Sequence, residues 1–102
     1  MKNEGDVKKL VKKVMHEYLE AGLWYFMPPA NGYGRSGIPD FVGCFKGHFF
    51  AIETKFGGNS LTANQLKEVS AIKYCGGEMW VVHDSTIDDF TNQFRAWAAL
   101  CS

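Results

Sequence analysis

Hydrophobic residues recur along the first part of the chain at the spacing of a helix with one buried stripe. The apolar positions lie three or four residues apart and comprise Val7, Leu10, Val11, Val14, Met15, Tyr18 and Leu19. This periodicity predicts an amphipathic helix, and we expect Gly22 to end it. The aromatic run at residues 23–27 is followed by two prolines, which cannot donate hydrogen bonds within a central ladder. We therefore expect an edge strand after this helix.

Two apolar runs in the middle of the chain, residues 41–45 and 49–54, predict a β-hairpin. If Lys46 and Gly47 form a two-residue turn, Asp40 lies directly across from Glu53. Directly opposed residues have Cβ atoms about 4.5 to 5.5 Å apart, and Lys55 projects from the same face as Glu53. One residue more or fewer in the turn would move the side chains of the second strand to the opposite face. On this register, the sequence predicts a cluster of two carboxylates and one ammonium.

The rest of the chain predicts a helix, a strand and a second helix. Thr62 and Gln65 have the spacing of a capping box. The helix that begins after Thr62 is expected to end at a Gly-Gly pair, residues 76–77, before a short buried strand at residues 79–82. Ser85 is expected to cap the last helix. The apolar stripes of these helices are Leu66, Val69 and Ile72, and Ile87, Phe90, Phe94, Trp97 and Ala98. The predicted order is α-β-β-β-α-β-α, an α/β fold with a mixed sheet covered by helices.

Composition limits the class of protein. The 102 residues are 46% hydrophobic, which suits a single domain over residues 1–102. Eleven basic residues balance eleven acidic ones, so neither a global basic field nor an acidic, disordered chain is indicated. Three cysteines without a Cys-x-x-Cys pair argue against a disulfide framework and structural zinc. No apolar run approaches the roughly 20 residues of a membrane span. We expect a cytoplasmic protein with no membrane partner.

The predicted neighbourhood of Asp40 and Glu53 requires a physical explanation. Like charges directly opposed in a sheet are destabilising, and both strands are otherwise apolar on both faces. Lys55 can offset only one of the two charges. A hard divalent cation would accept both carboxylates together with water or phosphate oxygens. In the alternative explanation, Asp40 ends a turn after Pro39, and Glu53 and Lys55 form a local ion pair.

The pattern Gly37-Ile38-Pro39-Asp40, followed after twelve residues by Glu53-Thr54-Lys55, resembles the Pro-Asp…Glu-x-Lys motif of restriction-endonuclease-like nucleases. Its Gly-x-Pro-Asp opening resembles that of the virus-type replication-repair nuclease (VRR-NUC) domain. An acidic residue near the start of the first helix, a Gly/Arg-rich loop, a Leu-Thr-Ala-Asn-Gln helix start and a Gly-Gly strand entry follow the family order over roughly residues 4 to 84. The resemblance implies a restriction-endonuclease-like mixed sheet with helices on both faces.

The resemblance also implies the roles of the clustered residues. Asp40 and Glu53 would bind a catalytic Mg²⁺ or Mn²⁺ together with the backbone carbonyl of Thr54, and Glu4 would be a further ligand. Lys55 would orient the attacking water and offset charge on the scissile phosphate, so that Asp40, Glu53 and Lys55 form the catalytic set. These roles are consistent with the known contributions of metals and cationic side chains to phosphodiester hydrolysis.

Other residues have two interpretations each. Glu4 also suits the first turn of a helix because of the helix dipole, and Gln65 also suits the capping box. Arg35 and Ser36, in the glycine-rich loop before Asp40, are candidates for contacting the DNA backbone, as is Gln65.

Lysines and aromatic residues near the expected site are further candidates for DNA contact. Lys8, Lys9, Lys12 and Lys13 indicate a solvated helix face that would also suit phosphates. Tyr25, Phe26 and Tyr33 flank the loop and would suit stacking on unpaired bases, although most aromatic residues are expected in the core.

The function that these expectations favour is a metal-dependent DNA endonuclease acting on structured DNA such as four-way (Holliday) junctions. The resemblance implies a homodimer and suggests a viral source, hence the host cytoplasm. A monomeric flap or nicking nuclease and a catalytically inactive DNA-binding module are the alternatives. The sequence between Gly32 and Gly37 spells G-x-G-x-x-G, but a proline and a strand follow it in place of a helix, so we expect no nucleotide cofactor.

Overall fold

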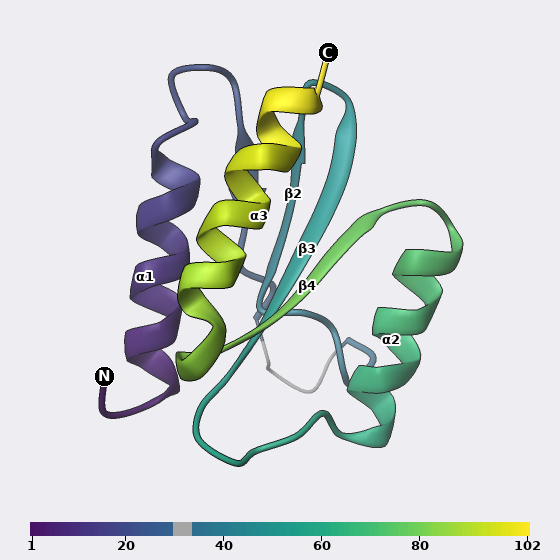
Figure 1. Ribbon diagram of the computed structural model, residues 1–102. Helices are drawn as coiled ribbons and strands as arrows, with labels where there is room; N and C mark the ends of the chain where they lie inside the picture. Colours follow the sequence, from purple (N-terminus) through teal and green to yellow (C-terminus); the bar gives the residue numbers. More distant parts are fainter. Residues whose placement is uncertain (30–33) are drawn as a thin grey trace.

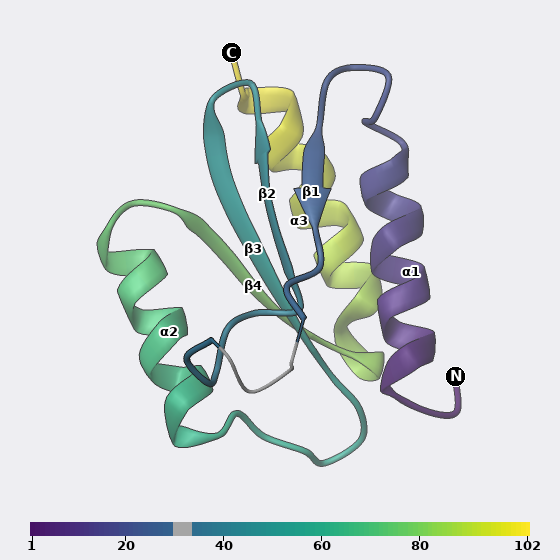
Figure 2. The same cartoon turned by 180° about the vertical axis from the view of Figure 1, so that it is seen from behind.

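The computed structural model describes residues 1–29 and 34–102. The chain forms a four-stranded sheet with helices on both faces (Figures 1 and 2). The elements are α1 (Glu4–His16), β1 (Trp24–Phe26), β2 (Phe41–Phe45), β3 (His48–Lys55), α2 (Ala63–Tyr74), β4 (Glu78–His83), the 3₁₀ turn η1 (Asp84–Thr86) and α3 (Ile87–Leu100). The predicted order of helices and strands is therefore confirmed. Within the described residues, no helix has the length and apolar character needed to cross a membrane.

The strands lie in the order β1-β2-β3-β4. The pairs β1–β2 and β2–β3 are antiparallel, whereas β4 runs parallel to β3, because α2 carries the chain back to the starting end of the sheet. Lys46 and Gly47 form the turn between β2 and β3, with φ values of 50° and 82°. Such values belong to the left-handed region that two-residue hairpins require. Phe45 pairs with His48, so the predicted register is confirmed.

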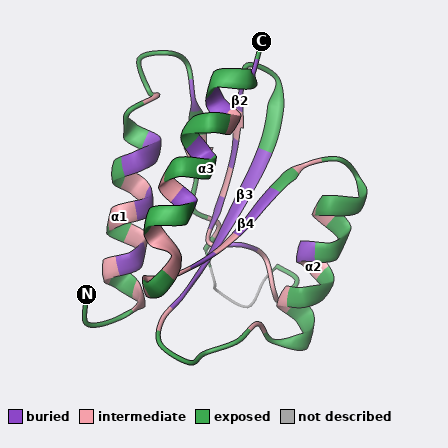
Figure 3. Cartoon of the chain, viewed as in Figure 1, coloured by how far each residue is buried: buried purple, intermediate pink, exposed green. Residues whose placement is uncertain are grey.

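The two faces of the sheet are covered to different extents. Helices α1 and α3 lie side by side on one face, and α2 covers part of the other (Figures 1 and 2). Figure 3 shows that buried residues are concentrated on the central strands and on the inner sides of α1 and α3, whereas most of α2 is exposed. The larger core joins α1 and α3 to one face of β2, β3 and β4 and includes Val7, Val11, Met15, Phe41, Phe50, Ile52, Trp80 and Phe94. The smaller core beneath α2 comprises Ala51, Val69 and Met79.

The first helix is shorter than predicted. It ends at His16 rather than at Gly22, and residues 17–22 continue as turns in which N–H groups bond to carbonyls three residues earlier, as Tyr18 bonds to Met15. Because these turns keep roughly helical side-chain spacing, Tyr18 still packs against the core. Gly22, with a φ of 99°, then reverses the chain into β1.

Two expectations about the later helices are wrong. Ser85 lies within η1 and caps nothing, since α3 begins at Ile87 without a side-chain cap. The local hydrogen bond runs instead from the His83 N–H to the Thr86 hydroxyl, at 2.9 Å. Leu66 is 56% exposed rather than buried, because α2 reaches the sheet mainly through the following turn of the helix.

Candidate active site

The hairpin brings Asp40 and Glu53 together at the end of the sheet opposite the turn. Asp40 is the last residue before β2, and the pairing of Phe41 with Ile52 continues to Asp40 opposite Glu53. The Asp40 N–H donates to Glu53 Oε1 at 3.2 Å. The predicted neighbourhood of the two carboxylates is thus present in the structure.

Thr54 holds the carboxylate of Asp40 in one orientation. Its N–H donates to Asp40 Oδ2 at 2.9 Å, and its hydroxyl donates to the same oxygen at 2.6 Å. Thr54 is fully buried, so bulk water does not compete with Asp40 for these two donors. The sequence predicts a role only for the Thr54 carbonyl, as a metal ligand, and that role stays a prediction. The two hydrogen bonds that Thr54 donates to Asp40 were not predicted.

Glu53 is an acid in an unfavourable electrostatic environment. The residue is 3% exposed, and burial, followed by the charge of Asp40, raises the pKa of Glu53 to about 8. The Lys55 ammonium lies 3.7 Å from Glu53 Oε2 and lowers this pKa, but it does not compensate for burial and Asp40. At neutral pH the carboxyl of Glu53 therefore holds a proton beside Asp40, as expected for two close carboxylates.

Gln65 connects the start of α2 to Glu53. The Gln65 N–H donates to Thr62 Oγ1 at 3.1 Å, and the Thr62 N–H donates to Gln65 Oε1 at 3.0 Å, which completes the predicted capping box. The same side chain uses its Nε2 to donate to Glu53 Oε2 at 2.6 Å. The capping and site interpretations of Gln65 therefore apply together, and its contact with DNA stays a prediction.

Lys8 enters the site from α1. Its ammonium lies 3.6 Å from Glu4 Oε2 and 3.7 Å from Asp40 Oδ1, and the side chain is only 30% exposed. Lys8 is thus less exposed than a fully solvated face implies, because its ammonium reaches Asp40, the residue before β2. The i, i+4 spacing from Glu4 gives the local pair, but the contact with Asp40 depends on tertiary packing.

The structure brings the oxygen ligands of Asp40 and Glu53 close together in one site. Carboxylates and carbonyls are the ligands that Mg²⁺ and Mn²⁺ prefer, and burial together with the charge of Asp40 raises the pKa of Glu53 even though Lys55 lies beside it. Asp40, Glu53 and the Thr54 carbonyl therefore fit such an ion. Among the residues described, no three or more His, Cys, Asp or Glu side chains are grouped to hold a metal. Lys8 stands between Glu4 and Asp40, so ligation by Glu4 stays a prediction.

The glycine-rich loop packs against the start of α2. Gly37 has a φ of 87°, and a Cβ there would lie 2.5 Å from the Asn64 backbone. The Asn64 amide donates to Ser36 Oγ at 2.6 Å, and Arg35 Nε pairs with Glu68 Oε2 at 2.6 Å. Arg35 is exposed but already paired, so a phosphate would compete with Glu68 for it. A pocket of about 310 Å³ is lined by Arg35, Ser36, Asn64, Lys67, Glu68 and Ala71.

The aromatic candidates lie in different environments. The Tyr25 hydroxyl is hydrogen-bonded to His16 Nε2 at 2.7 Å, and its ring packs 6.0 Å from that of Phe41. Tyr25 therefore faces α1 and the larger core rather than the loop. Phe26 is 45% exposed and packs beside the exposed Trp24 at 5.5 Å. The prediction for Tyr33 lies outside the described residues.

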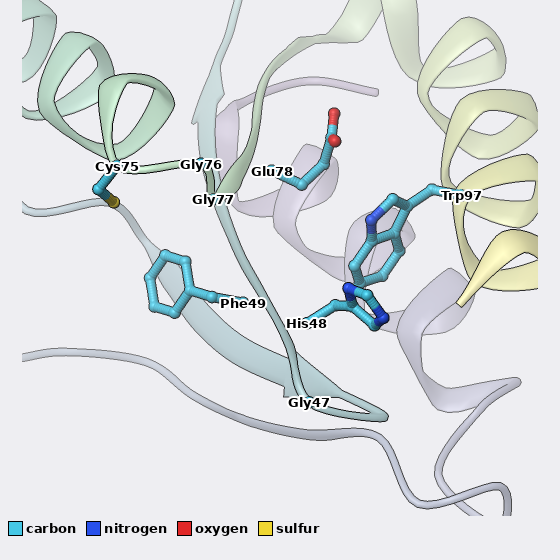
Figure 4. Close-up of a pocket in the computed structure, with 8 residues that line it drawn as sticks. All are labelled: Gly47, His48, Phe49, Cys75, Gly76, Gly77, Glu78 and Trp97. Carbon is cyan, nitrogen blue, oxygen red and sulfur yellow. The ribbon is translucent and has the colours of Figure 1, made fainter. Parts of the chain in front are cut away.

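Another pocket, of about 300 Å³, lies at the hairpin end of the sheet (Figure 4). It is lined by Gly47, His48, Phe49, Cys75, Gly76, Gly77, Glu78 and Trp97. His48 and Glu53 are five residues apart along β3, or about 17 Å at the rise of a strand. This pocket is therefore separate from the carboxylate cluster.

The sequence matches no model of a known protein family and no curated protein significantly. The structure resembles a solved "VRR_NUC domain" with a TM-score of 0.67 and 22% identity, over 89% of this chain and 96% of the other. It also resembles Hjc, a Holliday junction resolvase from the archaeal hyperthermophile Archaeoglobus fulgidus, with a TM-score of 0.50 and 20% identity, over 74% of this chain and 66% of the other. The chain therefore has a VRR-NUC/restriction-endonuclease-like fold, and the predicted fold class is confirmed.

Proposed function

We propose that the protein is a metal-dependent endonuclease that hydrolyses phosphodiester bonds in DNA. The observation that carries this proposal is the convergence of Asp40, Glu53 and Lys55 at one end of the sheet. The likeness to a VRR_NUC domain and a junction resolvase supports it. The structural alternative, a local ion pair between Glu53 and Lys55, accounts less well for the site, because that pair leaves a buried acid with a raised pKa beside Asp40.

In this proposal Asp40, Glu53 and the Thr54 carbonyl hold Mg²⁺ or Mn²⁺. Such an ion supplies Lewis-acid polarisation of a phosphoryl oxygen and makes water more acidic. Thr54 fixes Asp40 through two donors to Oδ2, and Gln65 fixes Glu53 through Oε2. The two carboxylates are thereby oriented before the substrate arrives, which lowers the cost of reorganisation during the reaction.

Lys55 and Glu53 carry the remaining roles. The Lys55 ammonium, nearly buried and next to Glu53, orients the attacking water and offsets the negative charge that builds on the phosphate. The Glu53 carboxyl, with a pKa of about 8, would give up its proton to solvent water in order to serve as a ligand. Both roles require the side chains to point to the same face of β3, as they do.

The preferred substrate in this proposal is a four-way junction, and the active form is a homodimer. The likeness of the fold to Hjc, a Holliday junction resolvase, supports the choice of substrate. Two strands must be cut to resolve a junction, so two copies of one site suit it. The exposed Trp24 and Phe26 on edge strand β1 offer apolar surface to a second copy.

The test is to incubate the protein with supercoiled plasmid, linear duplex, flap and four-way junction DNA in Mg²⁺, Mn²⁺ or EDTA. We expect metal-dependent cleavage, strongest on the junction, with about 10²-fold or greater loss in Asp40→Asn, Glu53→Gln and Lys55→Met. The exposed Lys73 provides the matched control Lys73→Met, which should retain activity. Cleavage that persists in EDTA or in Asp40→Asn would contradict the mechanism. Junction binding without cleavage would indicate a binding module, and activity of a monomer on flaps alone would favour a flap nuclease.

A further inference from the structure

We propose that Lys8 is an internal counter-ion of the site that changes partner during function. This proposal rests on the proposed nuclease function. Without a divalent ion, the Lys8 ammonium lies between Glu4 Oε2 and Asp40 Oδ1, at 3.6 and 3.7 Å. When an ion binds Asp40 and Glu53, Lys8 leaves Asp40 and pairs with a phosphate oxygen of the bound DNA.

The position of Lys8 distinguishes it from the other lysines of α1. Its pair with Glu4 is an ordinary contact between neighbouring turns of one helix, but its contact with Asp40 joins α1 to the start of β2. Both members of this second pair are partly shielded, with Lys8 30% and Asp40 21% exposed, so salt screens the contact less than it screens an exposed pair. Lys12, one turn further along α1, forms no ion pair with any described residue.

Charge competition supplies the reason for a change of partner. Each acid of the pair has one lysine beside it, Lys55 at Glu53 and Lys8 at Asp40, both at 3.7 Å. A divalent ion held by the two acids takes over the attraction that Asp40 exerts on Lys8 and repels the ammonium. Lys55 is nearly buried beside its acid, whereas Lys8 is three times as exposed, at 30% against 11%. Lys8 is therefore the lysine that can turn outward to a phosphate.

This arrangement makes two binding steps depend on one side chain in opposite directions. Without DNA, Lys8 competes with the metal and weakens its binding. With metal present, the released ammonium adds one phosphate contact and strengthens DNA binding. Metal and DNA would therefore favour each other's binding, although the ion binds the two carboxylates and the phosphate binds Lys8.

The first experiment measures Mn²⁺ binding by titration calorimetry without DNA in wild type, Lys8→Gln and the control Lys12→Gln. We expect Lys8→Gln to bind Mn²⁺ about 5- to 10-fold more tightly, at the low end of typical coupling between two binding events, and Lys12→Gln to match wild type. Equal or weaker Mn²⁺ binding by Lys8→Gln would overturn the proposal. Loss of unfolding stability in Lys8→Gln with unchanged Mn²⁺ affinity would show that Lys8 only fastens α1 to the sheet.

The second experiment measures the salt dependence of binding to a labelled four-way junction by fluorescence anisotropy, with Ca²⁺ in place of Mg²⁺. We expect Lys8→Gln to bind more weakly and to reduce the slope of log K against log salt by about 1, the value for one lost phosphate contact. An unchanged slope would overturn the second half of the proposal. If wild type binds Mn²⁺ and cuts DNA while Lys8→Gln equals it in both assays, only the role of Lys8 fails. If wild type binds no Mn²⁺, the proposed function and the role of Lys8 fail together.

Discussion

The raised pKa of Glu53 predicts that the metal-free protein loses stability as the pH increases. In the unfolded chain this carboxyl releases its proton near its ordinary value of 4.5, whereas in the folded protein it keeps the proton up to about 8. Between these values the unfolded state binds fewer protons than the native state, so the free energy of unfolding falls as pH rises. The stabilising contribution is complete below pH 4.5 and is lost by about pH 8.

The size of this effect follows from the width of the interval. Each pH unit between the two pKa values changes the free energy of unfolding by about 1.4 kcal/mol, and the interval from 4.5 to about 8 therefore corresponds to about 3 to 5 kcal/mol. Glu53→Gln removes the titrating proton and should remove this slope. Both oxygens of Glu53 accept from N–H groups, one from the Asp40 backbone and one from Gln65 Nε2, so the NH₂ of the new amide faces one of these donors. That mismatch costs the same at every pH and leaves the slope readable.

The assay is urea unfolding in EDTA at pH 5, 6, 7 and 8 for wild type and Glu53→Gln. We expect the difference in unfolding free energy between them to change by about 1 kcal/mol per pH unit across this range. Asp40→Asn should reduce the slope without abolishing it, because burial is the largest cause of the raised pKa and the charge of Asp40 the second. Parallel curves for wild type and Glu53→Gln from pH 5 to 8 would refute the reasoning.

Three further predictions concern the supports of the site. Thr54→Val removes the hydroxyl bond to Asp40; it should lower the free energy of unfolding by about 1 to 2 kcal/mol and weaken Mn²⁺ binding in calorimetry, and unchanged Mn²⁺ affinity would contradict it. Gly37→Ala should cost more than about 1 kcal/mol in urea unfolding because its Cβ meets the α2 backbone and φ is positive, whereas Gly34→Ala, whose Cβ would meet no atom of the described residues within 4 Å, should cost less; equal losses would count against this. Added Mn²⁺ at pH 8 should raise the Tm of wild type but not of Asp40→Asn, and equal increases would place the ion elsewhere.

The central hairpin was predictable because its determinants are local. The turn residues Lys46 and Gly47 and the alternating apolar positions of both strands specify one register, and that register alone puts Asp40 opposite Glu53. The capping box at Thr62 was predictable for the same reason. The pattern Gly-x-Pro-Asp and Glu-x-Lys then indicated the fold that the structural comparison confirms.

Contacts between distant elements were not predictable from the sequence. The pairing of Lys8 with Asp40 depends on how α1 packs beside β2, and the pairing of Arg35 with Glu68 depends on where the loop meets α2. The end of α1 at His16 was missed because tighter turns continue the apolar periodicity to Tyr18. In each case tertiary packing selected among several locally acceptable arrangements.

Cleavage of a labelled four-way junction by wild type and Asp40→Asn, followed over time at pH 8 in Mg²⁺ and in EDTA, tests the central claim most directly. The account predicts cuts by wild type in Mg²⁺ only, and about 10²-fold or slower cutting by a folded Asp40→Asn protein. Equal cutting by both proteins, or cutting that survives removal of the metal, would contradict it.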